Sequence, residues 1–216
     1  MNRQRKRYII EVGRPPEGGC AMREAKTERK TAETDISLFL RIDGTGRSAV
    51  DTGCGFLDHM LTLFATHGCF DLDLTCRGDV NVDFHHTAED VAIALGKAFR
   101  EASGDRAGIK RYASVTLPMD EALVLCAVDV SGRGVLRYNV KFPTEKVGDF
   151  DTELVKEFWA AFVRESAVTL HFLMIDGENS HHIAEAVFKA AARTVSEALG
   201  ADPRFEGRVP SSKGVL

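Results

Sequence analysis

One five-residue pattern, His-His-x-x-Glu, occurs twice in the chain. The first copy runs from His85 to Glu89 and the second from His181 to Glu185. The chain has seven histidines, and the two copies contain four of them. Imidazole nitrogens and carboxylate oxygens are ligands that proteins offer to transition metals. The two copies therefore indicate a metal-dependent chemistry.

Each copy begins an apolar run with the period of a helix, so its residues can be placed on a helix surface. Residues four apart share one face, which sets the first histidine of each copy over its glutamate. The neighbouring histidine, His86 or His182, is turned about 100° away. We therefore expect His86 and His182 to reach a second ion or a ligand from another segment. The alternative is a pair of polar helix N-termini, with glutamate facing the macrodipole; a single copy would favour that alternative, and the repetition favours metal binding.

The elements that must position these residues follow the same order in two successive halves of the chain. Each half has two extended stretches, a helix, a further strand and the helix that the motif opens. The expected strands include 33–42, 70–74, 119–130, 135–142 and 168–172, and the expected helices are 56–67, 85–102, 152–164 and 181–200. This order predicts an α+β fold built by internal duplication of a β-β-α-β-α unit, as two similar halves with sheets backed by helices.

The repeat also suggests how the chain is divided. Residues 1–21 are basic and then rich in Pro and Gly, which is typical of a flexible N-terminal extension. Residues 22–110 form the first half and 111–216 the second, and the two are expected to share one core as a compact domain. The repeat spacing is 86 residues between the turns at Asp43 and Asp129 but 96 between His85 and His181. The second half therefore carries ten extra residues, which we place near 140–151.

A third ligand in each half follows from the same repeat. His59 lies on the helix before the first motif, and Glu157 takes the matching position before the second if one loop is two residues shorter. Both residue types can ligate a metal. We therefore expect His59 to add a ligand to the first-half site and Glu157 to the second. Without the repeat, the favoured interpretation of His59 is a histidine on the surface of a helix.

Composition excludes several other classes of protein. The 216 residues are 44% hydrophobic and 28% charged, which is ordinary for a soluble globular protein. A net charge of -4 gives no reason to expect nucleic-acid or membrane binding, and no apolar run approaches the roughly 20 residues of a membrane span. The five cysteines are odd in number and form no C-x-x-C pair, which favours free thiols and a cytoplasmic protein.

Four separated motifs together resemble the imidazoleglycerol-phosphate dehydratase family. They are GFLDHML at 55–61, DFHHTAED at 83–90, ENSHHIAEA at 178–186 and PSSKG at 210–214, within a match from about Arg23 to Leu216. The resemblance implies dehydration of imidazole glycerol phosphate to imidazole acetol phosphate in histidine biosynthesis. It also implies two Mn²⁺ ions per active site, and a large cubic homo-oligomer of 24 subunits with active sites between subunits.

The resemblance further implies roles for individual residues. The metal-ligand set is His59, His85, His86, Glu89, His181, His182 and Glu185. Many members have a histidine where this chain has Glu157, which could serve as a substitute carboxylate ligand. The substrate-binding set, mainly for the phosphate, is Glu33, Arg111, Arg133, Lys189, Ser211, Ser212 and Lys213. Glu33, Glu89 and Glu185 are the candidate catalytic carboxylates, and His67 and His171 receive no role.

A mechanism follows as a hypothesis. Two metal ions on the two ring nitrogens of the substrate would lower the pKa of the imidazole N–H. The resulting imidazolate could expel the hydroxyl group as water through a diazafulvene-like intermediate, and a carboxylate would then remove the adjacent C–H proton. The alternative is a non-catalytic metal store or sensor, although di-iron proteins of that kind are four-helix bundles and this chain is rich in strands. A metallohydrolase is a further alternative, but the chain has no H-E-x-x-H motif.

Overall fold

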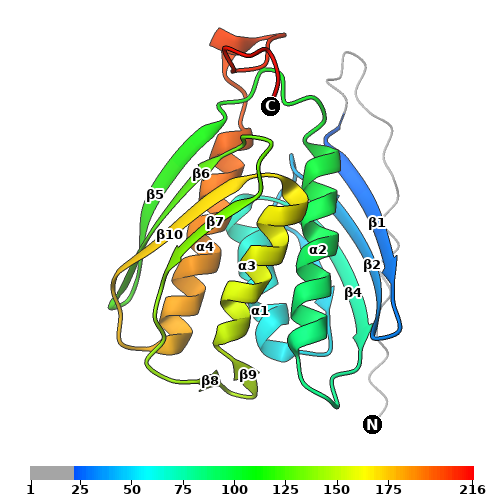
Figure 1. The fold of residues 1–216 in the computed structure, drawn as a ribbon, viewed down its shortest axis with the longest axis vertical. Coiled ribbons are helices and arrows are strands. Elements are labelled where there is room, and N and C mark those ends of the chain that lie inside the picture. The colour runs from blue at the N-terminus through cyan, green and yellow to red at the C-terminus, as the bar shows by residue number, and fades with distance from the viewer. Residues whose placement is uncertain (1–21) are drawn as a thin grey trace.

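The computed structural model describes residues 22–216, so the expected extension at 1–21 lies outside the described residues. Two four-stranded sheets flank the helices (Figure 1). The first half contains β1 (Glu24–Lys30), β2 (Thr34–Arg41), β3 (Ser48–Asp51), α1 (Gly55–Gly68), β4 (Asp71–Gly78) and α2 (His85–Ala102). The second half contains β5 (Tyr112–Met119), β6 (Ala122–Asp129), β7 (Val135–Asn139), β8 (Lys146–Val147), β9 (Phe150–Asp151), α3 (Glu153–Ser166), β10 (Thr169–Asp176) and α4 (Ser180–Leu199), followed by the 3-10 turn η1 (Pro203–Phe205).

The two sheets have the same topology, which confirms the α+β fold and the internal duplication. Their strand orders are β1-β2-β4-β3 and β5-β6-β10-β7. In both, the first three strands pair antiparallel and the last pair is parallel. Each half begins with one strand more than the sequence predicted, so the unit is β-β-β-α-β-α. The extra strand β1 lacks an apolar alternation because Ala25 is its one buried residue.

The spacing of the repeat changes twice along the chain: it grows by ten residues before α1 and α3, and it falls by two before the motifs, which are 96 residues apart. Thr34 and Ala122, the first residues of β2 and β6, are 88 positions apart, whereas Gly55 and Glu153, the first residues of α1 and α3, are 98 apart. The difference confirms the ten extra residues, and they contain the small hairpin β8-β9. The spacing of 86 derived from the turns was wrong by two residues, because Asp129 ends β6 while its supposed counterpart lies beyond the end of β2.

The helices pair between the halves. α1 packs on α4, and α2 packs on α3. Gly96 allows the close approach of α2 to α3, because a Cβ there would lie 2.7 Å from the carbonyl oxygen of Phe162. Aromatic rings join the helices in one core: the centroid of Trp159 on α3 lies 5.0 Å from that of Phe188 on α4 and 5.9 Å from that of Phe64 on α1. Within residues 22–216, no helix is both long and apolar enough to cross a bilayer.

Asp90 ties α2 to the first sheet. Its side chain is 10% exposed, and its carboxylate accepts hydrogen bonds from Arg29 on β1 at 2.8 Å and from Thr34 on β2 at 2.5 Å. Burial raises the pKa of Asp90, but the hydrogen bonds from Arg29 and Thr34 outweigh burial and hold that pKa below its ordinary value. Because the pKa is lower in the folded state, this stabilisation is complete above the unfolded-state pKa and is lost as pH falls through the folded-state pKa.

Replacing Asp90 with Asn should therefore lower the free energy of unfolding by about 2 kcal/mol at neutral pH, since Arg29, whose side chain is 28% exposed, would keep a partly buried guanidinium without its carboxylate. Urea unfolding followed by circular dichroism measures the change. The difference from the unsubstituted protein should shrink as pH falls below about 4, the ordinary pKa of aspartate. Asp73→Asn, on the exposed face of β4, is the matched control. Equal destabilisation by both variants would contradict the role of Asp90.

Candidate metal centre and substrate site

The two His-His-x-x-Glu motifs open α2 and α4, as the sequence predicts. The N–H of His85 donates to Asp83, and Asn179 caps α4 by accepting the N–H groups of His181 and His182. In each motif the rings of the adjacent histidines are nearly perpendicular, with centroids 6.3 Å apart in the first copy and 6.4 Å in the second. In the second motif the two rings also contact different carboxylates, His181 that of Glu185 and His182 that of Glu121, as their expected divergence requires.

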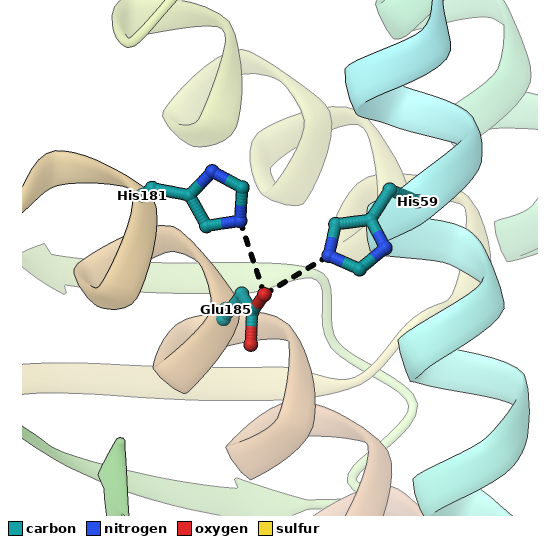
Figure 2. Close-up of side chains that lie close together, drawn as sticks. All are labelled: His59, His181 and Glu185. Atoms are coloured by element: carbon teal, nitrogen blue, oxygen red, sulfur yellow. Dashed lines mark hydrogen bonds and ion pairs between the residues drawn. The ribbon is translucent and has the colours of Figure 1, made fainter. Parts of the chain in front are cut away.

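Three candidate ligands meet where the N-terminal parts of α1 and α4 face each other (Figure 2). Nε2 of His59 lies 2.9 Å from Oε1 of Glu185, and Nε2 of His181 lies 3.0 Å from the same oxygen. The ligand atoms of the three side chains all lie within 4.8 Å of one another. Within residues 22–216, this is the one such group of His, Cys, Asp or Glu side chains.

His59 joins the motif of the other half, which corrects the expectation that it would add a ligand to the first-half site. The reason is the helix pairing: α1 packs on α4 rather than on α2. The matching position was assigned correctly, because His59 and Glu157 are the fifth residues of α1 and α3. Glu157 accordingly lies on α3, which packs on α2, the helix that the first motif opens.

Glu185 is the anionic centre of the group. Its side chain is 10% exposed, and Oε2 accepts a 2.5 Å hydrogen bond from Nζ of Lys189. Burial raises the pKa of Glu185, but Lys189 and the rings of His59 and His181 outweigh burial and lower that pKa to about 2. Glu185 is therefore ionised at neutral pH, as a metal ligand must be.

The donor set fits a divalent metal ion. His59 and His181 expose 43% and 42% of their side chains, so the nitrogen side of the group is open to solvent while the carboxylate is buried. Two imidazoles and one carboxylate are a common protein ligand set, and catalytic metal sites keep an open position for substrate. The group can therefore hold an ion and leave room for a further nitrogen or oxygen ligand.

The corresponding residues of the first motif are further apart. Nε2 of His85 lies 4.0 Å from Oε2 of Glu89, and the other carboxylate oxygen of Glu89 pairs with Arg164 of α3 at 3.2 Å. Glu157 is exposed on α3. It is not part of a three-ligand group among the described residues. Metal ligation by His85, Glu89 and Glu157 stays a prediction.

The second histidine of each motif faces carboxylates that the sequence analysis did not identify. Nδ1 of His86 lies 3.0 Å from Asp79, and its Nε2 lies 3.6 Å from Glu33. Nδ1 of His182 lies 2.7 Å from Glu121, and its Nε2 lies 3.7 Å from Asp120. Each nearby carboxylate raises the pKa of the histidine on which it acts. The His182 ring and the backbone N–H of Asn179 lower the pKa of Glu121 to about 2.

A signal for Glu121 was present in the sequence. At the structural spacing of 88 residues, Glu33 corresponds to Glu121. At the spacing of 86 taken from the turns, Glu33 corresponds to Met119, so the match was missed. Correct alignment of the strands would have shown a glutamate at this position in both halves.

The C-terminal segment lies at the end of the molecule where α4 ends, opposite the start of α4 (Figure 1). Most of the expected substrate-binding residues belong to this segment or are linked to it by the contacts that follow. Arg111 pairs with Asp129 at 2.8 Å, and its guanidinium also donates to the carbonyl oxygen of Pro210 at 2.8 Å. Arg133 lies 3.7 Å from the same Asp129. Ser211 follows Pro210 directly, and its hydroxyl oxygen accepts the N–H of Lys213. Ser212 lies between them and is exposed.

The helix α4 separates these residues from the three-ligand group. Arg111 donates its backbone N–H to the carbonyl of Ala198, in the last turn of α4, whereas Glu185 lies in the second turn. Thirteen residues of helix span about 20 Å. Lys189, expected with the phosphate set, lies one turn after Glu185 and pairs with it. His171, to which no role was assigned, is exposed on β10.

The comparisons with a family model, with curated proteins and with solved structures all point to one family. The model of the family described as imidazoleglycerol-phosphate dehydratase matches residues 52–195. The imidazoleglycerol-phosphate dehydratase of Methylorubrum extorquens is 54% identical over 195 residues, 90% of this chain and 100% of that protein; that of Cereibacter sphaeroides is 55% identical with the same coverage. The crystal structure of the Staphylococcus aureus enzyme has a TM-score of 0.76 and 39% identity, covering 83% of this chain and 99% of that one. The Pyrococcus furiosus structure has a TM-score of 0.76, 35% identity and coverage of 88% and 100%.

Proposed function

The chain belongs to the imidazoleglycerol-phosphate dehydratase family, a hydro-lyase of histidine biosynthesis, and on that premise we propose that it holds the imidazole ring of its substrate with two metal ions. The observation that carries the proposal is the group of His59, His181 and Glu185, whose ligand atoms lie within 4.8 Å of one another. The metal is proposed to be manganese. Nitrogen-rich ligands alone favour zinc or copper, so manganese rests on the family and on the carboxylates in the set.

The proposed ligands come from both motifs. His59, His181 and Glu185 would hold one ion, and the remaining candidates would supply the second: His85, His86, Glu89, Glu157 and His182. Ions held by these residues would supply positive charge beside the substrate ring, which would lower the pKa of the imidazole N–H. The chain itself orients the ligands: Asn179 and Asp83 fix the helix starts, and Glu185 holds both rings of its group.

Glu33 is the best-placed of the three candidate catalytic carboxylates to move a proton. The carboxylate of Glu185 is hydrogen-bonded to Lys189 and two histidines, and that of Glu89 forms an ion pair with Arg164. The side chain of Glu33 is 51% exposed, and His86 lies 3.6 Å from it. Over the whole proposed reaction the substrate loses one hydroxyl group and one C–H proton, which together make one molecule of water. Glu33 takes that C–H proton, and the resulting enol converts to the ketone.

We propose further that each active site is shared between subunits of a homo-oligomer. We call Arg111, Arg133, Ser211, Ser212 and Lys213 the Arg111 cluster. The three-ligand group and the Arg111 cluster lie at opposite ends of α4, about 20 Å apart along the helix. A substrate with three carbons between its ring and its phosphate cannot span that distance. The Arg111 cluster of one chain would therefore bind the phosphate of a substrate whose ring lies in another chain. The expected assembly of 24 subunits is compatible with this arrangement.

We propose a cytoplasmic location because the described cysteines are free thiols. Cys54, Cys69, Cys76 and Cys126 are free thiols, as the sequence analysis expected, and the fifth, Cys20, lies outside the described residues. Free thiols are typical of a reducing compartment. The expected absence of nucleic-acid and membrane partners remains a prediction from net charge.

The experiment that tests the proposed function measures turnover of imidazole glycerol phosphate by metal-stripped protein before and after Mn²⁺ is added. We expect ketone formation to fall to background on stripping and to return with about two Mn²⁺ per chain, because the ligand set needs both ions. Zn²⁺ and Mg²⁺ serve as comparison metals. Tight Mn²⁺ binding without turnover would favour a metal store or sensor, and full turnover by stripped protein would contradict the metal role.

A further inference from the structure

The carboxylate of Glu121 contacts three donors around the start of α4. Its Oε2 lies 2.7 Å from Nδ1 of His182. Its Oε1 accepts the backbone N–H of Asn179 at 2.7 Å and of Glu178 at 3.2 Å. Asn179 in turn caps α4 through the N–H groups of the two motif histidines. Glu121 therefore joins the turn between β5 and β6 to the residues that set the direction of the His182 ring.

The contact selects one form of the His182 ring. An ionised carboxylate only accepts hydrogen bonds, so Nδ1 must carry the proton, and the lone pair of a neutral ring is left on Nε2. The nearest carboxylate to Nε2, that of Asp120, lies 3.7 Å away, which is too far for a hydrogen bond. Metal-ligating histidines usually donate their second N–H to a carboxylate or carbonyl in this way, which fixes the ring and strengthens the ligand.

The two halves use the repeated glutamate differently. In the first half Nδ1 of His86 is held by Asp79, and Glu33 lies beside Nε2 instead. The β4-to-β10 spacing of 98 residues places Gly177 at the position of Asp79. A Cβ at Gly177 would lie 2.7 Å from Cγ1 of Ile183, so a side chain does not fit there. With no carboxylate from that position, Glu121 takes the place at Nδ1.

We propose that Glu121 is a positioning residue that presents Nε2 of His182 to a metal ion, whereas its repeat counterpart Glu33 is left free for proton transfer. The proposal rests on the proposed metal-dependent function. It assigns different tasks to two glutamates that occupy equal places in the duplicated unit. Asp79 has the same positioning task for His86 in the first half, so each motif has one carboxylate that holds its second histidine.

The test compares Glu121→Gln with Glu178→Gln, a charge-matched control on the same surface whose side chain is exposed. Glutamine has the same shape but carries no charge, and its single carbonyl oxygen can accept either the Nδ1–H or the backbone N–H groups, while its NH₂ group faces the other side as a donor. We expect Glu121→Gln to weaken binding of one Mn²⁺ by about 10- to 100-fold, the usual cost of losing a partner behind a metal ligand. Titration followed by the electron paramagnetic resonance of free Mn²⁺ measures this. Glu178→Gln should bind Mn²⁺ as the unsubstituted protein does.

A second readout does not depend on metal. In metal-free protein labelled with ¹⁵N-histidine, the His182 signals, identified by their loss in His182→Ala, should show one Nδ1–H form that becomes a mixture in Glu121→Gln. Unchanged Mn²⁺ affinity together with an unchanged ring form would overturn the positioning role alone. If the unsubstituted protein bound no Mn²⁺, the proposed function would fail as well, so the two failures can be told apart. Should Glu121→Gln not fold, Glu121→Asp provides the same comparison with a shortened carboxylate.

Discussion

Replacing Glu185 with Gln is expected to lower turnover by about 1,000-fold or more and to remove one metal ion per chain. Partners behind a metal ligand typically account for about 10- to 100-fold, and a ligand that binds the ion directly should exceed that. Oε1 of Glu185 lies within 3.0 Å of Nε2 on both His59 and His181, so the loss of its charge weakens the whole group. Steady-state turnover and metal content by mass spectrometry measure the two effects.

The matched control for this prediction lies on the same helix. Glu197 is an exposed glutamate near the end of α4, and its carboxylate pairs with Lys110. Glu197→Gln should retain both metal and turnover. Circular dichroism of both variants excludes a general loss of structure, which is a concern because Glu185→Gln leaves the ammonium group of Lys189 without its carboxylate. A Glu185→Gln protein with full metal content and full activity would contradict the metal assignment.

Replacing Glu33 with Gln is expected to reduce kcat by about 10²- to 10⁴-fold, the usual contribution of a positioned acid or base. Its metal content should change little, because the side chain of Glu33 is 51% exposed and lies outside the three-ligand group. Rapid-quench and steady-state kinetics on the Mn²⁺-loaded protein measure kcat and KM separately. The combination of lost turnover and retained metal distinguishes Glu33 from Glu185.

Asp35→Asn is the control for Glu33. Asp35 lies two residues further along, at the exposed start of β2, and pairs with Lys30 at 2.6 Å. We expect its replacement to leave kcat within about twofold, as surface changes away from functional sites usually do. If Glu33→Gln kept full kcat, proton transfer would have to be assigned to Glu89 or to a group from another subunit.

Local patterns predicted the helices and the motif geometry well. The 3.6-residue period placed the helix of the first motif at 85–102, where α2 is found, and the spacing of four residues correctly set His181 over Glu185. These features depend on interactions between residues close in sequence. The strand β1 was missed because six of its seven residues are not buried, so it presents no apolar face that a period could reveal.

Contacts between distant elements could not be predicted in the same way. The sequence equated His59 with Glu157, but it did not show that α1 packs on α4 and so brings His59 to the second motif. Helix pairing depends on how ridges and grooves fit in the shared core, which no local period records. The role of Glu121 was not predicted because the two halves were aligned with a spacing of 86 residues instead of 88. Equivalent strand residues are matched only when the register is correct.

The length of α4 has a consequence for how mutations in different chains of one assembly combine in their effect on activity. On the proposed arrangement, the first turns of this helix serve one active site and its last turn supports another. A single defective chain in an assembly would then harm more than one site. Conversely, a chain mutated at Glu185 keeps an intact Arg111 end, and a chain mutated at Arg111 keeps an intact Glu185 end. Together the two chains could form one complete active site. Two separately harmful alleles of this gene could therefore restore some activity when expressed together, whereas two lesions at the same end of α4 could not.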